Sequence, residues 1–127
     1  MKVETKRIAA AWPGASVRRI SSDNNHYAVI YDTGYGEHVI HDDFRHDSYD
    51  RILPDSLVFS PNGRRLAYAT QKGSSGFLVV NRETHGPFDG LGTPVFSPDS
   101  RCVACIAAFG NRHGVVLIKA GLQQHRP

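Results

Sequence analysis

One segment of the sequence occurs twice. Residues 58–69 read Val-Phe-Ser-Pro-Asn-Gly-Arg-Arg-Leu-Ala-Tyr-Ala, and residues 95–106, 37 positions later, read Val-Phe-Ser-Pro-Asp-Ser-Arg-Cys-Val-Ala-Cys-Ile. A fainter third copy lies 39 positions upstream, where residues 19–30 read Arg-Ile-Ser-Ser-Asp-Asn-Asn-His-Tyr-Ala-Val-Ile. A chain that repeats itself at such a period is usually an array of one supersecondary unit. The fold is therefore best predicted unit by unit.

Each copy contains the same series of short apolar runs separated by turn residues. We predict a leading strand at 17–20, 56–59 and 93–96, a second strand at 26–31, 65–70 and 102–107, and a third strand at 38–40, 77–80 and 115–118. A fourth strand is expected near 48–52 and 87–91 in the first two copies. Four short antiparallel strands repeated every 37–40 residues are typical of a β-propeller blade. The predicted fold is all-β, a single domain with about three four-stranded blades at approximately 15–55, 56–92 and 93–127.

The turn after the leading strand has a defined chemistry. Proline presets φ for the first turn residue, and Asn, Asp or Gly tolerates the backbone angles that follow. In the two clear copies the motif residues are Phe59, Ser60, Pro61, Gly63, Phe96, Ser97, Pro98 and Asp99. The motif extends upstream of the last copy, where residues 88–98 read Phe-Asp-Gly-Leu-Gly-Thr-Pro-Val-Phe-Ser-Pro. Over residues 57–118 these motifs resemble the WD40-like, or PD40, repeats of TolB-type β-propellers.

This resemblance implies a propeller fold and, for most relatives, a role in binding partners. Similar blades also precede the catalytic domain of prolyl-oligopeptidase-like peptidases, but this chain contains no Gly-x-Ser-x-Gly motif. The first copy departs from the family pattern, because Ile20, Ser22 and Asn24 stand in the places of the Phe, Pro and Gly. Its turn geometry is therefore left open by the sequence.

The number of repeats is too small for a propeller ring, which typically has 4–8 blades. The last copy lacks a clear fourth strand after Ile118, while residues 1–14 precede the first copy in the place of an outer strand. We therefore predict a homodimer with three blades from each chain in a six-bladed ring. Residues 1–14, through Val3, Ile8 and Trp12, would supply an outer strand to the last blade of the partner. The alternatives are a piece of a longer propeller, pairing with a different chain, a larger ring, or a helix at residues 2–12.

Charge and hydropathy exclude some classes of partner. The net charge is +3 with a pI near 9.1, but basic and acidic residues are interleaved, so no basic stripe for nucleic acid is present. No apolar run approaches the ~20 residues that span a bilayer, and residues 1–12 are too weakly apolar for a secretory signal. We expect a cytoplasmic protein that binds no nucleic acid, membrane or cofactor.

The densest group of possible metal ligands is the run from His41 to Asp47. Its candidate ligands are His41, Asp42, His46 and Asp47, since imidazole and carboxylate groups are common ligands of transition metals. The repeat places this run on the turn between the third and fourth strands, and the corresponding residues 81–85 do not repeat the ligands. A solvated turn is therefore the competing interpretation. The other histidines show no ligand spacing.

Two further features are weighed against structural roles. Arg18 and Arg19 replace apolar residues on the innermost strand, where they could hold an anion in a central channel or form an ion pair with Asp23 or Asp55. Cys102 and Cys105 form a lone Cys-x-x-Cys, but positions i and i+3 of a strand point to opposite faces. The two thiols are therefore expected to diverge as ordinary strand residues.

No catalytic constellation is evident in the sequence. The predicted function is a non-enzymatic interaction module that self-assembles and binds a protein or small ligand at the rim or channel of the ring. The alternatives are a metal- or anion-binding propeller enzyme and a lectin-like carbohydrate binder, because fold alone does not fix function.

Overall fold

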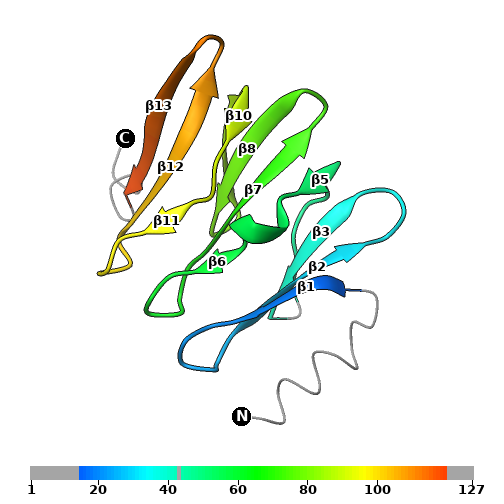
Figure 1. Cartoon of the computed structure of the whole chain (residues 1–127). Coiled ribbons are helices and arrows are strands. Elements are labelled where there is room, and N and C mark those ends of the chain that lie inside the picture. The colour runs from blue at the N-terminus through cyan, green and yellow to red at the C-terminus, as the bar shows by residue number, and fades with distance from the viewer. Residues whose placement is uncertain (1–14, 43, 120–127) are drawn as a thin grey trace.

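Three antiparallel β-sheets follow one another along the chain and lie side by side (Figure 1). The computed structural model describes residues 15–42 and 44–119. This part of the chain is all-β, as predicted, and its helical content is the single 3-10 turn η1 (Pro54–Ser56). No sheet within the described ranges closes into a ring.

The first sheet has the strand order β1-β2-β3-β4, with bounds β1 (Ala15–Ile20), β2 (Tyr27–Asp32), β3 (Glu37–His41) and β4 (Phe44–Arg45). The second sheet has the order β5-β7-β8-β9, and β6 also pairs with β7; its strands are β5 (Arg51–Ile52), β6 (Val58–Phe59), β7 (Leu66–Lys72), β8 (Ser75–Val80) and β9 (Glu83–Phe88). The third sheet places β12 between β13 on one side and both β10 and β11 on the other; its strands are β10 (Gly90–Leu91), β11 (Val95–Phe96), β12 (Cys102–Phe109) and β13 (Arg112–Lys119).

The leading, second and third strands of every copy are confirmed. The predicted fourth strands are confirmed only in part, since Tyr49 bridges to Glu37 of β3 and Phe88 pairs with Gly76 of β8. Segments 51–52 and 90–91 pair with β7 and β12, so they begin the second and third sheets instead of ending the preceding ones. The fourth strands are β4 and β9, which return at once from β3 and β8 through residues with positive φ, Asp42 (51°), Asn81 (50°) and Arg82 (72°). Residues 83–85 accordingly lie in a strand and not in the predicted turn. A short left-handed turn leaves no room for the longer polar loop that the sequence indicated.

The turn after each leading strand has the same hydrogen bonds in all three copies. Ser21, Ser60 and Ser97 each donate through Oγ to the Asx side chain two residues later, at 2.5, 2.7 and 2.6 Å. The same Oγ atoms accept from the backbone N–H five residues later, at 3.1, 3.0 and 3.0 Å. A residue with positive φ follows the Asx in each turn: Asn24 (63°), Gly63 (78°) and Ser100 (66°). The first copy thus adopts the motif turn without its Pro or Gly, because the Ser and the Asx supply the bonds that fix it.

The three turns also contact one another along the lower left edge in Figure 1. Ser22 donates through Oγ to the carbonyl of Pro61 at 2.8 Å, which links the first turn to the second. The N–H of Asn62 donates to Oγ of Ser100 at 2.9 Å, which links the second turn to the third. Both bonds join residues 38 or 39 positions apart, so the sheets follow one another at a repeated spacing.

Register and alternation give every sheet two equivalent faces, which we call the A face and the B face. The A faces contain Ala28, Ile30 and Val39 in the first sheet, Ala67, Ala69, Leu78 and Val80 in the second, and Ala104, Ile106, Val115 and Leu117 in the third. The B faces contain Val29 and Ile40, Tyr68 and Val79, and Cys105 and Val116. Cross-strand pairs match between copies, since Ile30 pairs with Val39 as Ala69 pairs with Leu78 and Ile106 with Val115. The sheets therefore present the same two faces in the same order.

The core is formed where the A face of one sheet meets the B face of the next. The A face of the first sheet packs on the B face of the second in a cluster that contains Ala28, Ile30, Val39, Tyr49, Ile52, Leu57, Leu66, Tyr68 and Val79. The A face of the second sheet packs on the B face of the third through Ala67, Leu78, Val80, Val103 and Cys105. At the start of the series, Val29 and Ile40 are buried on the B face of the first sheet beside Tyr27 and Tyr31.

Candidate functional site

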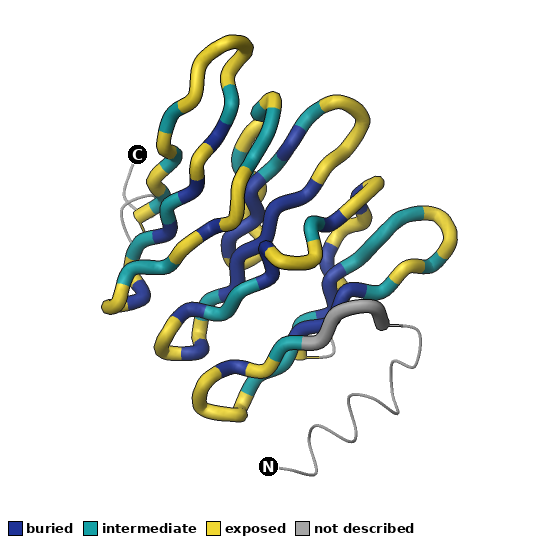
Figure 2. The backbone as a smooth tube through the Cα atoms, viewed as in Figure 1, coloured by how far each residue is buried: buried dark blue, intermediate teal, exposed yellow. Residues whose placement is uncertain are grey.

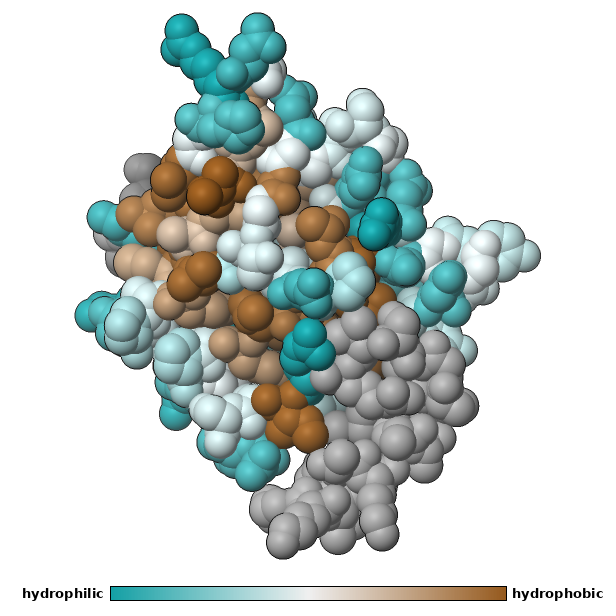
Figure 3. Space-filling model, in the orientation of Figure 1, coloured by the Kyte–Doolittle hydropathy of each residue, from teal (hydrophilic) through white to brown (hydrophobic). Residues whose placement is uncertain are grey.

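The A face of the third sheet is exposed. Val95, Ile106, Val115 and Leu117 have exposed fractions of 63, 61, 70 and 52%. Their equivalents on the second sheet are covered, since Ala69 and Leu78 are 0% exposed and Val80 is 6% exposed. Figure 3 shows hydrophobic side chains gathered over β12 and β13, and in Figure 2 the exposed and half-buried positions alternate along β13. This contiguous apolar face is the kind of surface that marks an interface.

The outer edge of the third sheet is also open in the described part of the chain. The first and second sheets each have a fourth strand, β4 and β9, beside the third strand of their copy. In the third sheet, β13 pairs with β12, and no other strand among residues 15–42 and 44–119 pairs with it. An unpaired edge presents a row of backbone donors and acceptors to another strand. The edge and the A face together form one uncovered end of the sheet series.

A second candidate site is a group of three polar side chains at one end of the first sheet. His26 precedes β2, His41 ends β3 and Asp42 follows it, so the β2–β3 pairing brings all three together. One carboxylate oxygen of Asp42, Oδ2, lies 2.6 Å from Nδ1 of His26 and 3.6 Å from Nε2 of His41. We call His26, His41 and Asp42 the histidine cluster.

The backbone of β2 fixes the carboxylate of the histidine cluster. Oδ1 of Asp42 accepts from the N–H of Tyr27 at 2.9 Å, and the N–H of Asp42 donates to the carbonyl of Tyr27 at 3.1 Å. Oδ1 is thereby occupied, and Oδ2 is left facing the two imidazoles. Burial lowers the pKa of His41, an effect that the carboxylate of Asp42 opposes and that His26 and Arg82 reinforce. Burial thus favours the neutral imidazole of His41.

Behind the cluster, His46 is buried against the second sheet. Its Nδ1 lies 2.8 Å from the hydroxyl of Tyr68, and its ring centroid lies 5.9 Å from that of His41. Burial lowers the pKa of His46 to about 4, and the nearby His41 and Arg82 act in the same direction. Burial also raises the pKa of the Tyr68 hydroxyl. Neutral His46 therefore accepts from Tyr68, and its Nε2 is buried without a hydrogen-bond partner.

The structure brings together two of the four predicted metal ligands and adds one that the sequence did not indicate. His41 and Asp42 meet in the cluster, whereas His46 bonds to Tyr68 and Asp47 is exposed on the loop after β4. The sequence indicated no ligand spacing for His26, and the structure places it beside His41 and Asp42. The hairpin register contains the missing signal, because the pairing of Ala28 with His41 places residue 26 beside the end of β3.

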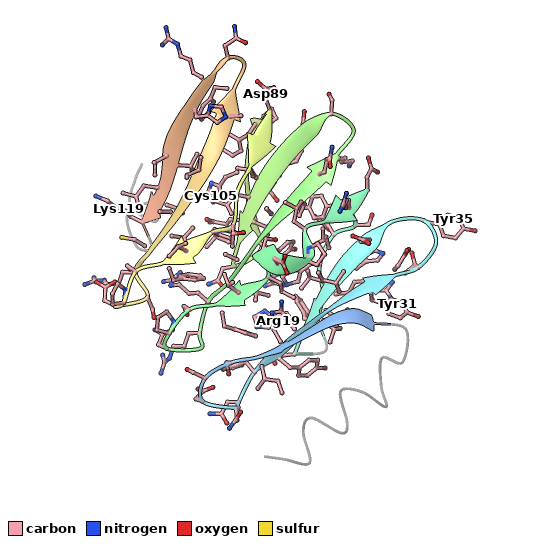
Figure 4. All side chains as sticks on the ribbon, viewed as in Figure 1. Arg19, Tyr31, Tyr35, Asp89, Cys105 and Lys119 are labelled. Atoms are coloured by element: carbon pink, nitrogen blue, oxygen red, sulfur yellow. The ribbon has the colours of Figure 1, made fainter. Side chains whose placement is uncertain are left out.

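Arg18 and Arg19 lie on β1, where they pair with Val29 and Ala28 in the register of the first sheet. Arg19 is half-buried and extends from β1 in Figure 4. The channel in which these residues were expected to hold an anion stays a prediction, since it depends on ring closure. The predicted contact residues Val3, Ile8 and Trp12 lie outside the described residues.

The two thiols diverge as predicted. Cys105 is buried on the B face between the second and third sheets, and its Sγ donates to the carbonyl of Gly92 at 3.2 Å. Burial raises the pKa of this thiol, which makes it a weak nucleophile. Cys102 is half-buried on the A side of β12, where it pairs with Lys119 at the end of β13. Both cysteines are free.

No protein-family model, curated protein or solved structure matches this chain. Residues 15–42 and 44–119 contain no helix long and apolar enough to cross a membrane. Over residues 15–42 and 44–119, the class of protein that the structure defines is an all-β chain of three stacked antiparallel sheets, in which the A face of the third sheet is exposed.

Proposed function

We propose that the chain is a non-enzymatic interaction module of the β-propeller kind, in which two copies assemble into a ring of six blades. The observation that carries this proposal is the exposed A face of the third sheet, whose equivalent on the second sheet is buried. Each sheet would be one blade of the ring. The protein or small ligand bound at the rim or channel stays a prediction from the sequence.

The repeat indicates which surface would cover the exposed A face. Within the chain, an A face packs on the B face of the next sheet, twice in succession. The next surface in that series is another B face of the same repeat, and the B face at the other end of the chain belongs to the first sheet. A second copy of this chain is therefore the occupant that we propose. For this contact to form, the A face of the partner's third sheet must pack against the B face of the first sheet. Val29 and Ile40 are buried on that B face in the single chain.

The chemistry of the face favours a permanent contact between copies. Its central residues Val95, Ile106 and Leu117 are aliphatic, and the charged Lys119 lies at the end of β13. Burying the exposed part of each large aliphatic side chain contributes on the order of 1 kcal/mol. Residues 1–14 of the partner would add a strand beside β13, where the backbone edge is unpaired in the described part of the chain. These contributions must exceed the free-energy cost of association.

Light scattering on the full-length chain tests the assembly. The wild type is expected at twice the 14.0 kDa chain mass, and the double variant Val115→Thr/Leu117→Thr at the single-chain mass. Threonine has a β-branched side chain that suits a strand, and its hydroxyl is costly to bury. Tyr35→Thr is the matched control, because Tyr35 is 97% exposed at the tip of the β2–β3 hairpin (Figure 4). A wild-type monomer, or a dimer that survives the double variant, would contradict the proposal.

Cysteine cross-linking then tests the order of the blades in a Cys102→Ser background. Closure of the ring predicts a disulfide between Val115→Cys on one copy and Tyr31→Cys on the other, from the A face to the B face. It predicts none between two chains that carry only Val115→Cys. Cross-linking of Val115→Cys with itself would show two A faces in contact and would exclude the ring.

A further inference from the structure

The histidine cluster combines donor groups of two kinds within a small space. The imidazoles of His26 and His41 offer nitrogen, the carboxylate of Asp42 offers oxygen, and the ligand atoms all lie within 4.8 Å of one another. His26 and His41 are half-buried, and Asp42 is exposed at the rim of the group. Solvent can therefore reach the cluster, while the sheet holds its members.

The separations are close to those of a bound ion. Zinc binds imidazole nitrogen and carboxylate oxygen at about 2.0–2.2 Å, which sets tetrahedral ligand atoms about 3.3 Å apart. Oδ2 of Asp42 is already 3.6 Å from Nε2 of His41. Its 2.6 Å contact with Nδ1 of His26 is a hydrogen bond, in which the proton occupies the place that a cation would take. These two separations lie on either side of the spacing of about 3.3 Å that a tetrahedral ion sets, and all the ligand atoms of the cluster lie within 4.8 Å of one another.

Packing around the cluster limits how far its members can move. The ring of His41 meets the ring of Phe59 edge-on at 5.6 Å and that of His46 at 5.9 Å. Asp42 is tied to both backbone polar groups of Tyr27. A group of ligands held by its surroundings loses less entropy when it binds an ion.

From this geometry we propose that His26, His41 and Asp42 form a binding site for one divalent transition-metal ion of the zinc class. Two nitrogens and one carboxylate suit zinc or cobalt, whereas calcium and magnesium favour all-oxygen ligand sets. Three protein ligands leave a fourth position for water or for a group from a bound molecule. The ion would join the start of β2 to the turn between β3 and β4.

Titration calorimetry on the full-length chain at neutral pH tests the site with Zn²⁺ as the probe. One ion per chain is expected, and His26→Ala, His41→Ala and Asp42→Asn are each expected to weaken binding by about tenfold or more. The Asp42→Asn amide can still accept from the N–H of Tyr27, so this variant keeps the turn. His113→Ala is the control, because His113 is exposed on β13 in another sheet, and it should leave the affinity unchanged.

A measurement on the wild type keeps the test valid if a variant unfolds. Nitrogen NMR of the imidazoles should show Zn²⁺-dependent shifts at Nδ1 of His26 and Nε2 of His41. Absent binding would overturn the proposal, as would an affinity equal in wild type and all three ligand variants. Shifts confined to other histidines would also overturn it, because they would place the ion elsewhere.

Discussion

The second and third sheets carry equivalent A faces that end in opposite environments. Leu78 of the second sheet is 0% exposed and its equivalent Val115 is 70% exposed, although each pairs across its hairpin in the same way. The difference comes from the neighbouring sheet, since the third sheet covers the second and no described residue covers the third. The same apolar pattern is thus a core in one repeat and a surface in the next.

The largest expected effect is the difference in stability between equivalent mutations on these two A faces. Leu78→Ala removes fully buried methyl groups and should lower the free energy of unfolding by about 2–5 kcal/mol. Val115→Ala should lower the free energy of unfolding of a dissociated chain by less than about 0.5 kcal/mol, since its side chain is mostly exposed. Urea denaturation at low protein concentration measures both values. Equal costs would show that the third A face is covered within a single chain.

A second comparison concerns the two interfaces between sheets. The first-to-second interface contains the buried pair His46–Tyr68, whereas the second-to-third cluster consists of apolar side chains and Cys105. The pKa of His46 is lowered from 6.5 to about 4, so the unfolded chain binds a proton that the folded chain excludes in this range. Stability from this group is therefore complete above pH 6.5 and is lost as the pH falls toward 4. The loss amounts to at most about 3 kcal/mol.

Hydrogen exchange between pH 7 and 4, in the presence of a metal chelator, would show which strands lose stability when His46 is protonated. The amides of β4 and β7 should lose protection before those of β12 and β13. His46→Phe keeps a ring in the site without a titrating group and should flatten the pH dependence of stability. A pH dependence retained in His46→Phe would assign the loss to other groups.

The smallest expected effect is the difference in unfolding free energy between serine mutations in two equivalent turns. Ser60→Ala removes a buried hydroxyl that accepts from the N–H of Arg65, and it should cost about 1–2 kcal/mol of unfolding free energy. Ser97→Ala removes the equivalent bond to the N–H of Cys102 from a more exposed turn and should cost less, about 0.5–1 kcal/mol. Thermal unfolding of both variants gives the order. The reverse order would show that burial does not control the strength of this turn.

Much of the fold could be predicted because its signals are local. The strand pattern follows from alternation over five to eight residues, and the motif turn depends on bonds between Ser, Asx and a backbone N–H within five positions. The predicted fourth strands were misplaced in part because segments 51–52 and 90–91 pair with β7 and β12 of the following sheets. Segments 51–52 and 90–91 contain only two residues each, too few for a pattern to show which sheet they join.

The histidine cluster was half visible in the sequence. His41 and Asp42 are adjacent and were selected as possible ligands, whereas His26 lies just before β2 and meets them only through the β2–β3 register. His46, a close neighbour in sequence, instead pairs with Tyr68 of the second sheet, 22 positions away. Proximity in sequence therefore predicted some contacts and misassigned others.

The sequence by itself determined the repeat, the all-β class and the first three strands of each unit, because these depend on neighbours within one unit. Only the tertiary structure decided which A face is covered, which strand joins which sheet, and which histidines meet. Burial and the meeting of side chains depend on contacts between different units. Equivalent residues of similar units therefore differ in exposure when one unit has a neighbouring sheet and the other lies at the end of the series.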